Sequence, residues 1–237
     1  MGVGVKFDKY HSYDDWGLHL ISMRIPMPEP KVYRVSIPGT DGSLDLSSIG
    51  GNRTTYNDRE GLEFVFDLMD GSYSKWLTTY SQISNAIHGQ KIQVTPDDDL
   101  GYYYVCRLNV DSQKSNPVLS QITLTGTADP YKYDVQTSIE DWLWDPFNFE
   151  TGVIREVKDI QITASNKTVE ILGSGLDVVP IFAVSASDSL ALTYGGKSYP
   201  LPVGNTRLPE VRVGGTTQTL TFTGTGTLSV DFRGRSL

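Results

Sequence analysis

Most of the chain alternates apolar and polar residues in short runs between clusters of Gly, Pro, Asn and Asp. A period of two is typical of a half-buried β-strand, because successive side chains point to opposite faces of a sheet. The segment SQITLTGTA (residues 120–128) has this pattern. In LEFVFDL (residues 62–68) it places four large side chains on one face: Leu62, Phe64, Phe66 and Leu68. The sequence therefore predicts a mainly β fold.

One segment has a helical period instead. In SYSKWLTTYSQISNAIHG (residues 72–89) Ser72 or Ser74 can cap the start of a helix and Gly89 its end. An aromatic ligand site is conceivable here, but packing of a helix on a sheet is the commoner reason for the spacing. We therefore expect a helix whose packed face carries Trp76, Tyr80, Ile83 and Ile87.

The composition of the chain changes after Pro130, and the second half consists of short segments rich in Thr, Ser, Gly and Val. About seven short strands with no helix between them predict an antiparallel sandwich of jelly-roll or lectin type. We expect an N-terminal domain over residues 1–130, an aromatic-rich linker over 131–150 and a C-terminal domain over 151–237. The turn signals of the second half are Gly195-Gly196 and Gly214-Gly215, which we expect in hairpins, and Gly204-Asn205 and Gly224-Thr225-Gly226.

The segment DWLWDPFNFET (residues 141–151) has neither period, yet it is the most aromatic stretch of the chain. Two interpretations compete: a linker buried between two folded bodies, or an exposed platform for a ligand or a neighbouring subunit. The turn signals at Asp145-Pro146 and at residues 150–152 favour the buried linker. The candidate linker or interface residues are Trp142, Trp144, Phe147 and Phe149.

The net charge and the cysteine content limit the kinds of function that the protein can have. The formal net charge of the 237 residues is −8, which disfavours nucleic-acid binding as the main task. Cys106 is the single cysteine, so an internal disulfide is excluded, and we expect a small core hydrophobe in a protein made in a reducing cytoplasm. No secretory signal or membrane-spanning apolar run is recognisable, so we expect no membrane contact.

No motif for catalysis, cofactor binding or metal binding is present. His11, His19 and His88 are far apart, and no HExxH or GxSxG pattern occurs. The acidic stretches PDDDLG (residues 96–101) and GTDGSLDLS (residues 39–47) lack the ligand spacing of an EF-hand and read as loops. We predict no catalytic, cofactor or metal residue, although paired carboxylates of a glycoside hydrolase remain a third hypothesis.

Five stretches together resemble the distal tail protein of long, flexible-tailed (siphovirus-type) bacteriophages. The resemblance extends over nearly the whole chain, and its most specific part is the first stretch, in which a Trp-Gly strand precedes proline-rich residues and VSIPGTDGSLDLS. The stretches are GVKFDKYHSYDDWGLHLISMRIPMPEPKVYRVSIPGTDGSLDLS, EGLEFVFDL, ADPYKY, DWLWDPFNFETG and VDFRGRSL.

This resemblance implies a non-enzymatic structural hub of the tail tip or baseplate. Family members form a homo-hexameric ring from an N-terminal β-sandwich with one α-helix, and a C-terminal galectin-like sandwich projects outward. The ring joins the tail tube protein to the tail-associated baseplate or fibre protein, and the outer domain can carry receptor-binding proteins. The protein would end in the virion, with DNA only as passing cargo and no cofactor.

A lectin-like module that binds carbohydrate on the host cell surface is the alternative function. A galectin-like fold does not by itself confer sugar binding, because function depends on the site. Galectins hold galactosides with a cluster of His, Asn, Arg and Trp, whereas this chain has no His and no Trp after residue 151. The galactoside site is therefore expected to be missing.

Overall fold

The computed structural model describes residues 4–48, 53–70, 72–111, 120–141, 154–164, 167–173 and 175–237. The chain divides into two compact units, which are described separately below. The first contains the N-terminal residues up to Asp99 and Tyr103–Lys132, and the second contains Leu100–Tyr102 and Tyr133–Ser236. The expected mainly β fold, with one α-helix among the described residues, is confirmed. The boundaries predicted for the linker at 131–150 stay a prediction.

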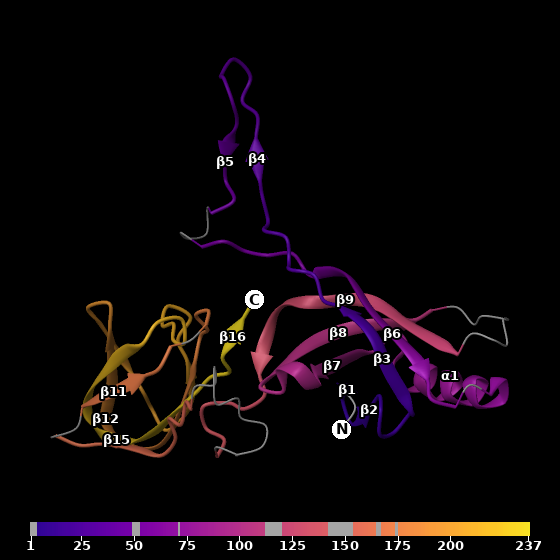
Figure 1. The fold of residues 1–237 in the computed structure, drawn as a ribbon. Helices are drawn as coiled ribbons and strands as arrows, with labels where there is room; N and C mark the ends of the chain where they lie inside the picture. The colour runs from indigo at the N-terminus through magenta and orange to yellow at the C-terminus, as the bar shows by residue number, and fades with distance from the viewer. Residues whose placement is uncertain are drawn as a thin grey trace. The chain divides into compact units, whose positions relative to one another are not determined.

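The first unit is built on a sheet whose strands follow the order β2-β1-β7-β8-β9-β6-β3 (Figure 1). A separate two-stranded sheet pairs β4 with β5. The strands are β1 (Val5–Phe7), β2 (Tyr10–His11), β3 (Leu18–Arg24), β4 (Arg34–Val35), β5 (Leu44–Asp45), β6 (Arg59–Leu68), β7 (Lys91–Pro96), β8 (Tyr102–Val110) and β9 (Gln121–Asp134).

The predicted alternation in β6 is confirmed by burial. Leu62, Phe64, Phe66 and Leu68 all lie in the core of the first unit. Residues 63–67 of β6 pair antiparallel with β3 on one side and with β9 on the other, so this part of the strand is hydrogen-bonded on both sides. A strand placed centrally in a sheet can bury one face completely, which is why its pattern is so regular.

Helix α1 (Tyr73–Ile87) lies where the helical period predicts it, and Trp76, Ile83 and Ile87 pack into the same core as the sheet. Tyr80 is only half-buried, because its hydroxyl reaches the Asp111 carbonyl at 2.9 Å. Ser72 occupies the N-cap position without a side-chain hydrogen bond, and Gly89, after the helix, has φ +70°. Among the described residues no helix is long and apolar enough to span a lipid bilayer.

The loop between β7 and β8 contains a short 3-10 helix, η1 (Asp97–Asp99). Residues 96–101 were expected to be a solvated loop, and Asp98 is exposed as expected. Asp97 differs, because its carboxylate accepts the backbone N–H of Gly4 at 2.8 Å. The loop therefore also ties the first strand of the unit to β7.

The second unit is built on a sheet in the order β10-β15-β12-β13, to which β11 adds on β15 and β14 on β12. All of the pairings with a defined register in this sheet are antiparallel. The strands of this unit are β10 (Ile160–Ile162), β11 (Thr168–Ile171), β12 (Ile181–Tyr194), β13 (Lys197–Pro200), β14 (Gly204–Arg207), β15 (Gln218–Asp231) and β16 (Arg235–Ser236).

The two long strands β12 and β15 form a bent ladder that curls the sheet over its own core. Their register shifts between Val184 and Ala186 and again between Asp188 and Ala191. Before these bulges β12 pairs with β14, and after them it pairs with β13. β15 likewise changes partner from β11 to β10. Because a bulge bends a strand, the two halves face each other as the layers of a sandwich.

Three predicted turns of the second half are wrong, and one is confirmed. Gly195-Gly196 joins β12 to β13, with φ values of +57° and +76° that suit a two-residue hairpin. Gly224-Thr225-Gly226 lies inside β15, opposite the bulge of β12, so the sequence marks a bend and not a chain reversal. Gly204 and Asn205 belong to β14.

Gly214-Gly215 does not close a hairpin either. Val213 pairs with Val178, whereas Gln218, four residues after Gly214, pairs with Ile171 of β11. The two glycines therefore connect segments with different partners. A Cβ at Gly215 would lie 2.1 Å from the Asp177 carboxylate oxygen that accepts the Gly215 N–H, so a larger residue would displace that side chain.

Candidate functional site

Between β3 and β6 the described residues 26–48 and 53–58 form a long excursion from the sheet of the first unit, which we call the arm. Figure 1 shows β4 and β5 side by side partway along it, with the hairpin loop beyond them. The arm is held as a hairpin by backbone hydrogen bonds from Lys31 to Thr55, at 2.7 Å, and from Asn57 to Glu29, at 2.8 Å. The segment KVYRVSI, expected to be a strand, contributes only Arg34–Val35 to β4.

The arm is rich in apolar side chains that nothing in the described part of the chain covers. It supplies five of the twelve large hydrophobic residues that are exposed among the described residues. Because monomeric proteins rarely leave a contiguous set of apolar side chains uncovered, the arm is the candidate interaction surface of the first unit. The five are Met27 (71% exposed), Val32 (61%), Tyr33 (63%), Ile37 (43%) and Leu44 (51%).

Polar contacts shape the outer part of the arm. The Tyr33 backbone donates to the Ser47 hydroxyl oxygen at 2.8 Å, and the Arg34 and Asp45 side chains form an ion pair at 3.6 Å. Hydrogen bonds from Ser47 lower the pKa of Asp45 below its ordinary value. The first part of the acidic stretch GTDGSLDLS is the loop that was predicted, and Gly42 has φ +77° there, whereas Leu44–Asp45 form strand β5.

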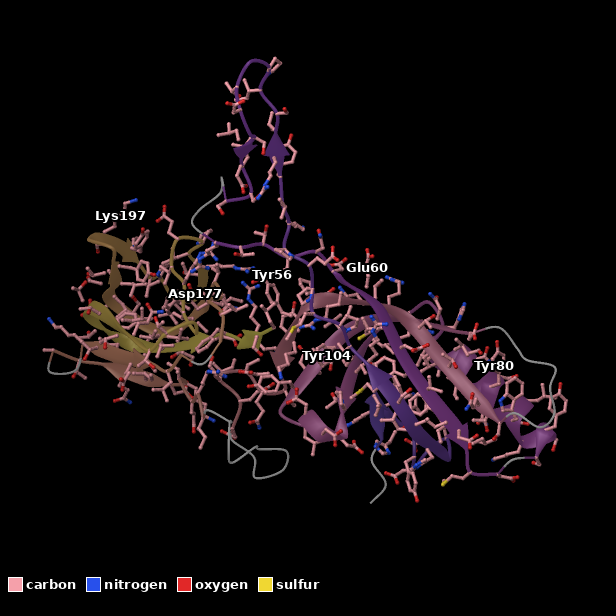
Figure 2. The ribbon with its side chains drawn as sticks, turned by 45° about the horizontal axis from the view of Figure 1, so that its top comes forward. Tyr56, Glu60, Tyr80, Tyr104, Asp177 and Lys197 are labelled. Carbon is pink, nitrogen blue, oxygen red and sulfur yellow. The ribbon has the colours of Figure 1, made fainter. Side chains whose placement is uncertain are left out.

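The root of the arm contains a buried arginine. Arg59, the first residue of β6, is 2% exposed. Its Nη1 donates to the Pro26 carbonyl at 2.8 Å, and its Nε donates to the Pro130 carbonyl at 3.1 Å. The guanidinium also lies over the ring of Tyr104, 5.4 Å from its centroid. Figure 2 labels Tyr104, and it labels Tyr56 on the returning side of the arm.

Burial governs the ionisation of the groups around this root. Desolvation lowers the pKa of Arg59 and raises the pKa of Tyr104. Cys106, fully buried in β8, has its pKa raised to about 12, mainly by burial. The prediction of a core cysteine is confirmed, and a thiol held protonated in this way is not a nucleophile at neutral pH.

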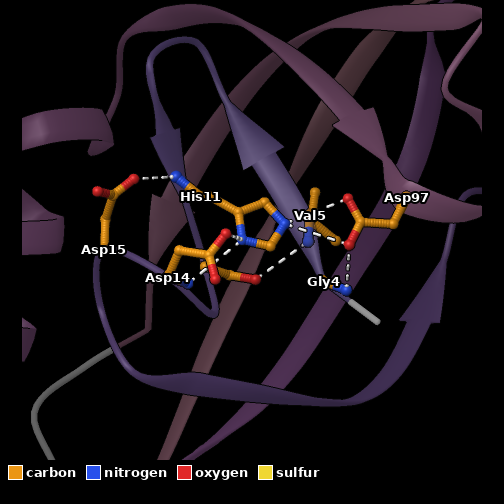
Figure 3. Close-up of polar contacts among 7 residues, drawn as sticks. Gly4, Val5, His11, Asp14, Asp15 and Asp97 are labelled. Carbon is orange, nitrogen blue, oxygen red and sulfur yellow. Dashed lines mark hydrogen bonds and ion pairs between the residues drawn. The ribbon is translucent and has the colours of Figure 1, made fainter. Parts of the chain in front are cut away.

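His11 forms a second polar cluster near the start of the first unit (Figure 3). Its Nε2 lies 3.2 Å from both carboxylate oxygens of Asp97, and its Nδ1 lies 3.2 Å from Asp14. Within the described ranges no group of three or more His, Cys, Asp or Glu residues could hold a metal ion. The cluster is better explained as a clasp that joins β2 to η1, because Asp97 also binds the backbone of Gly4.

A shallow groove of about 500 Å³ lies beside α1, lined by residues that include Tyr10, Trp16 and Asn85. Aromatic rings with amides nearby could suggest a saccharide site, but a sugar needs an open ring face. Trp16 stacks on one side of Tyr10 at 5.4 Å, and Lys9 lies over the Tyr10 ring at 5.0 Å. The Tyr10 ring therefore already has two neighbours within the protein, and nothing in the groove favours a saccharide over this internal packing.

The four candidate residues named from the sequence, Trp142, Trp144, Phe147 and Phe149, lie outside the described residues, so their role stays a prediction. The sequence resemblance included residues 35–47 of the arm, but it did not indicate that the arm is uncovered, and it did not single out Arg59. Alternation in residues 31–37 indicates a strand but not whether anything covers it. Nothing in the local sequence of Arg59 shows that it is buried.

Comparison with known proteins gives a match for the fold. No protein-family model matches the sequence, and neither does any curated protein. Among solved structures, the crystal structure of the SPP1 Dit (gp 19.1) protein, a paradigm of the hub adsorption apparatus in Gram-positive infecting phages, matches with a TM-score of 0.64. The match covers 100% of both chains at 14% sequence identity.

The chain has the fold of the SPP1 Dit protein. A match over both whole chains includes both units, and it agrees with the mainly β architecture described above. At this identity the likeness establishes the fold alone, because one fold can host different functions.

Proposed function

We propose that this protein is a structural hub subunit of a siphovirus-type phage tail, located at the tail tip or baseplate of the virion. The observation that carries the proposal is the similarity of fold, over the full length of both chains, to a phage hub protein. The five sequence stretches that resemble distal tail proteins support it independently. The role is non-enzymatic and depends on wide surfaces rather than on a pocket.

We further propose that the subunits close into a homo-hexameric ring through the arm. A cyclic ring requires heterologous contacts, in which one patch meets a different patch on the next subunit. The arm supplies one such patch, because its exposed Val32 and Tyr33 belong to no core of their own unit. If a second copy of the chain covered these two side chains, the burial of apolar surface would stabilise the contact by about 25 cal/mol per Å².

The partners of the ring follow from the same proposal. One side would bind the tail tube protein, the other the tail-associated baseplate or fibre protein, and the second unit could carry receptor-binding proteins. DNA would pass through the ring only as cargo. The net charge of −8 suits this, since acidic residues along a channel would repel the DNA.

Light scattering after size exclusion, over a concentration series and with negative-stain imaging, tests the assembly. We expect a six-fold ring with a central hole. Val32→Ser and Tyr33→Ser should shift assembly to about tenfold higher concentration. Val203→Ser is the matched control, because Val203 is 64% exposed, like Val32, but lies in the second unit. Equal effects of Val32→Ser and Val203→Ser, or a protein that stays monomeric beside its tail partners, would contradict the proposal.

A further inference from the structure

Arg59 joins the two ends of the arm. It is the residue at which the returning chain enters β6, and its Nη1 binds the carbonyl of Pro26, 33 residues earlier, where the arm begins. The same guanidinium reaches the carbonyl of Pro130 near the end of β9. One side chain therefore ties both roots of the arm to the sheet of the first unit.

The geometry requires an arginine. The two carbonyls are bound by different nitrogens, Nε and Nη1, at 3.1 and 2.8 Å, so the planar fork spans both at once. The Tyr104 ring, 5.4 Å below, holds the plane of the fork. A lysine has a single flexible ammonium and cannot reproduce a planar, two-point contact.

The contacts of Arg59 do not suggest that its main role is to stabilise the sheet. No carboxylate of the described residues bonds the guanidinium, and its buried Nη2 has no hydrogen-bond partner among them. Burying a charge in this way costs free energy, and an apolar side chain of similar volume is often neutral or stabilising in its place. Pro26 and Pro130 are half-buried and not in the core, so we expect water to replace the arginine at their carbonyls if the side chain is removed.

We propose that Arg59 is a positioning residue, whose fork sets the direction in which the arm leaves the sheet. The arm is then presented in one conformation, which lowers the conformational entropy lost when it binds. The fixing of the arm root depends only on the contacts above. Its use in docking on a second copy rests on the proposed hub function.

Hydrogen exchange of the full chain tests the positioning role directly. In Arg59→Met we expect the amides of Lys31 and Asn57, which close the hairpin near its root, to exchange about tenfold faster. The amides of β6 and β9 should be unchanged, and the Tm should be equal or higher. Arg59→Lys should show the same local loss. Arg24→Met is the matched control, since Arg24 is an exposed arginine at the end of β3 and should change nothing.

The opposite pattern would overturn the proposal. Unchanged exchange at Lys31 and Asn57 in either folded variant would mean that the arm root does not depend on the fork. Faster exchange throughout the first unit with a lower Tm would make Arg59 a stabilising core residue only. If Arg59→Met does not fold, Arg59→Lys, which keeps the charge, provides the same local readout.

The docking consequence is measured separately from the hub function itself. If the natural sequence forms a ring, Arg59→Met should need about tenfold more protein to form it, which supports the docking role; an unchanged ring would overturn that role. If the natural sequence forms no ring with its partners, the hub proposal fails. The exchange result at Lys31 and Asn57 then still decides whether Arg59 positions the arm.

Discussion

Phe232 donates its backbone N–H to the hydroxyl oxygen of Ser138 at 2.8 Å, across 94 positions of sequence. The same hydroxyl donates to the Val230 carbonyl at 2.6 Å, and the Ser138 backbone N–H donates to the Phe232 carbonyl at 3.0 Å. Ser138 is 1% exposed. It therefore fastens the segment that enters the second unit to the end of β15.

Replacing this hydroxyl should destabilise the second unit. Ser138→Ala leaves the buried N–H of Phe232 without its acceptor, which costs about 1–3 kcal/mol of unfolding free energy. Urea unfolding followed by fluorescence measures the change. Ser198→Ala, at an exposed position of β13, is the control and should stay within about 0.5 kcal/mol. Equal stability of the two variants would show that the Ser138 network contributes nothing.

Two glycines with similar backbone angles should differ in their tolerance of alanine. Gly196 has φ +76° and open space around it, so Gly196→Ala should cost about 1 kcal/mol from the backbone alone. Gly224 has φ +80°, and a Cβ there would lie 2.2 Å from the Ser189 carbonyl oxygen. Gly224→Ala should therefore cost about 3 kcal/mol or more, because the bulge of β12 must shift.

Thermal unfolding of both glycine variants makes this comparison. A larger loss of Tm in Gly196→Ala than in Gly224→Ala would contradict the close approach of β15 to the bulge. Both glycines have a similar positive φ, so the free-energy cost of the backbone conformation is common to the two variants. The difference between them therefore reports only the space available for the Cβ.

The Cys106 thiol should be inert in the folded protein. With its pKa raised to about 12, about one thiol in ten thousand is ionised at pH 8. A thiol reagent such as DTNB should react only after denaturation. Fast reaction of the native protein would show that β8 opens or that the thiol is not buried.

The same pKa predicts an effect of pH on stability. The folded-state pKa of Cys106 lies above the ordinary thiol value of 9.0, so the thiol of the unfolded chain loses its proton first as the pH rises. The stabilisation is complete below pH 9 and is lost between pH 9 and about 12, with a slope of at most about 1.4 kcal/mol per pH unit. Cys106→Ala should reduce the alkaline slope even though it lowers the stability at pH 7.

The clasp between His11 and Asp97 should appear as a coupling energy. Because both side chains are partly exposed and Asp97 lies 3.2 Å from the ring, we expect about 0.5–1.5 kcal/mol in a double-mutant cycle of His11→Gln and Asp97→Asn. Unfolding free energies of the four proteins give the value. Strict additivity would show that Asp97 acts only through the backbone of Gly4.

The elements that the sequence predicted well are those whose pattern is local. Trp76, Ile83 and Ile87 specify α1 by their spacing, and Leu62 to Leu68 specify the buried face of β6. The errors arise where a local signal has two structural outcomes. Gly224 marks either a turn or a bend, and pairing with β12 on both sides of the bulge makes it a bend.

The candidate site depended far more on tertiary structure. Alternation in residues 31–37 indicated a strand, but the exposure of Val32 and Tyr33 follows from the lack of any covering segment in the described chain. The burial of Arg59 could not be predicted from the sequence, because the groups that it contacts come from β8 and from chain near the ends of β3 and β9.

By itself the sequence determined the mainly β class, the single α-helix of the described chain and the sides of the elements that become buried. It did so because periodicity records which side of an element is apolar. The tertiary structure alone decided that the arm stays uncovered, that Arg59 closes its root and that β12 and β15 run through their bulges. These features depend on segments far apart in the chain, and periodicity within one segment carries no information about what lies against it.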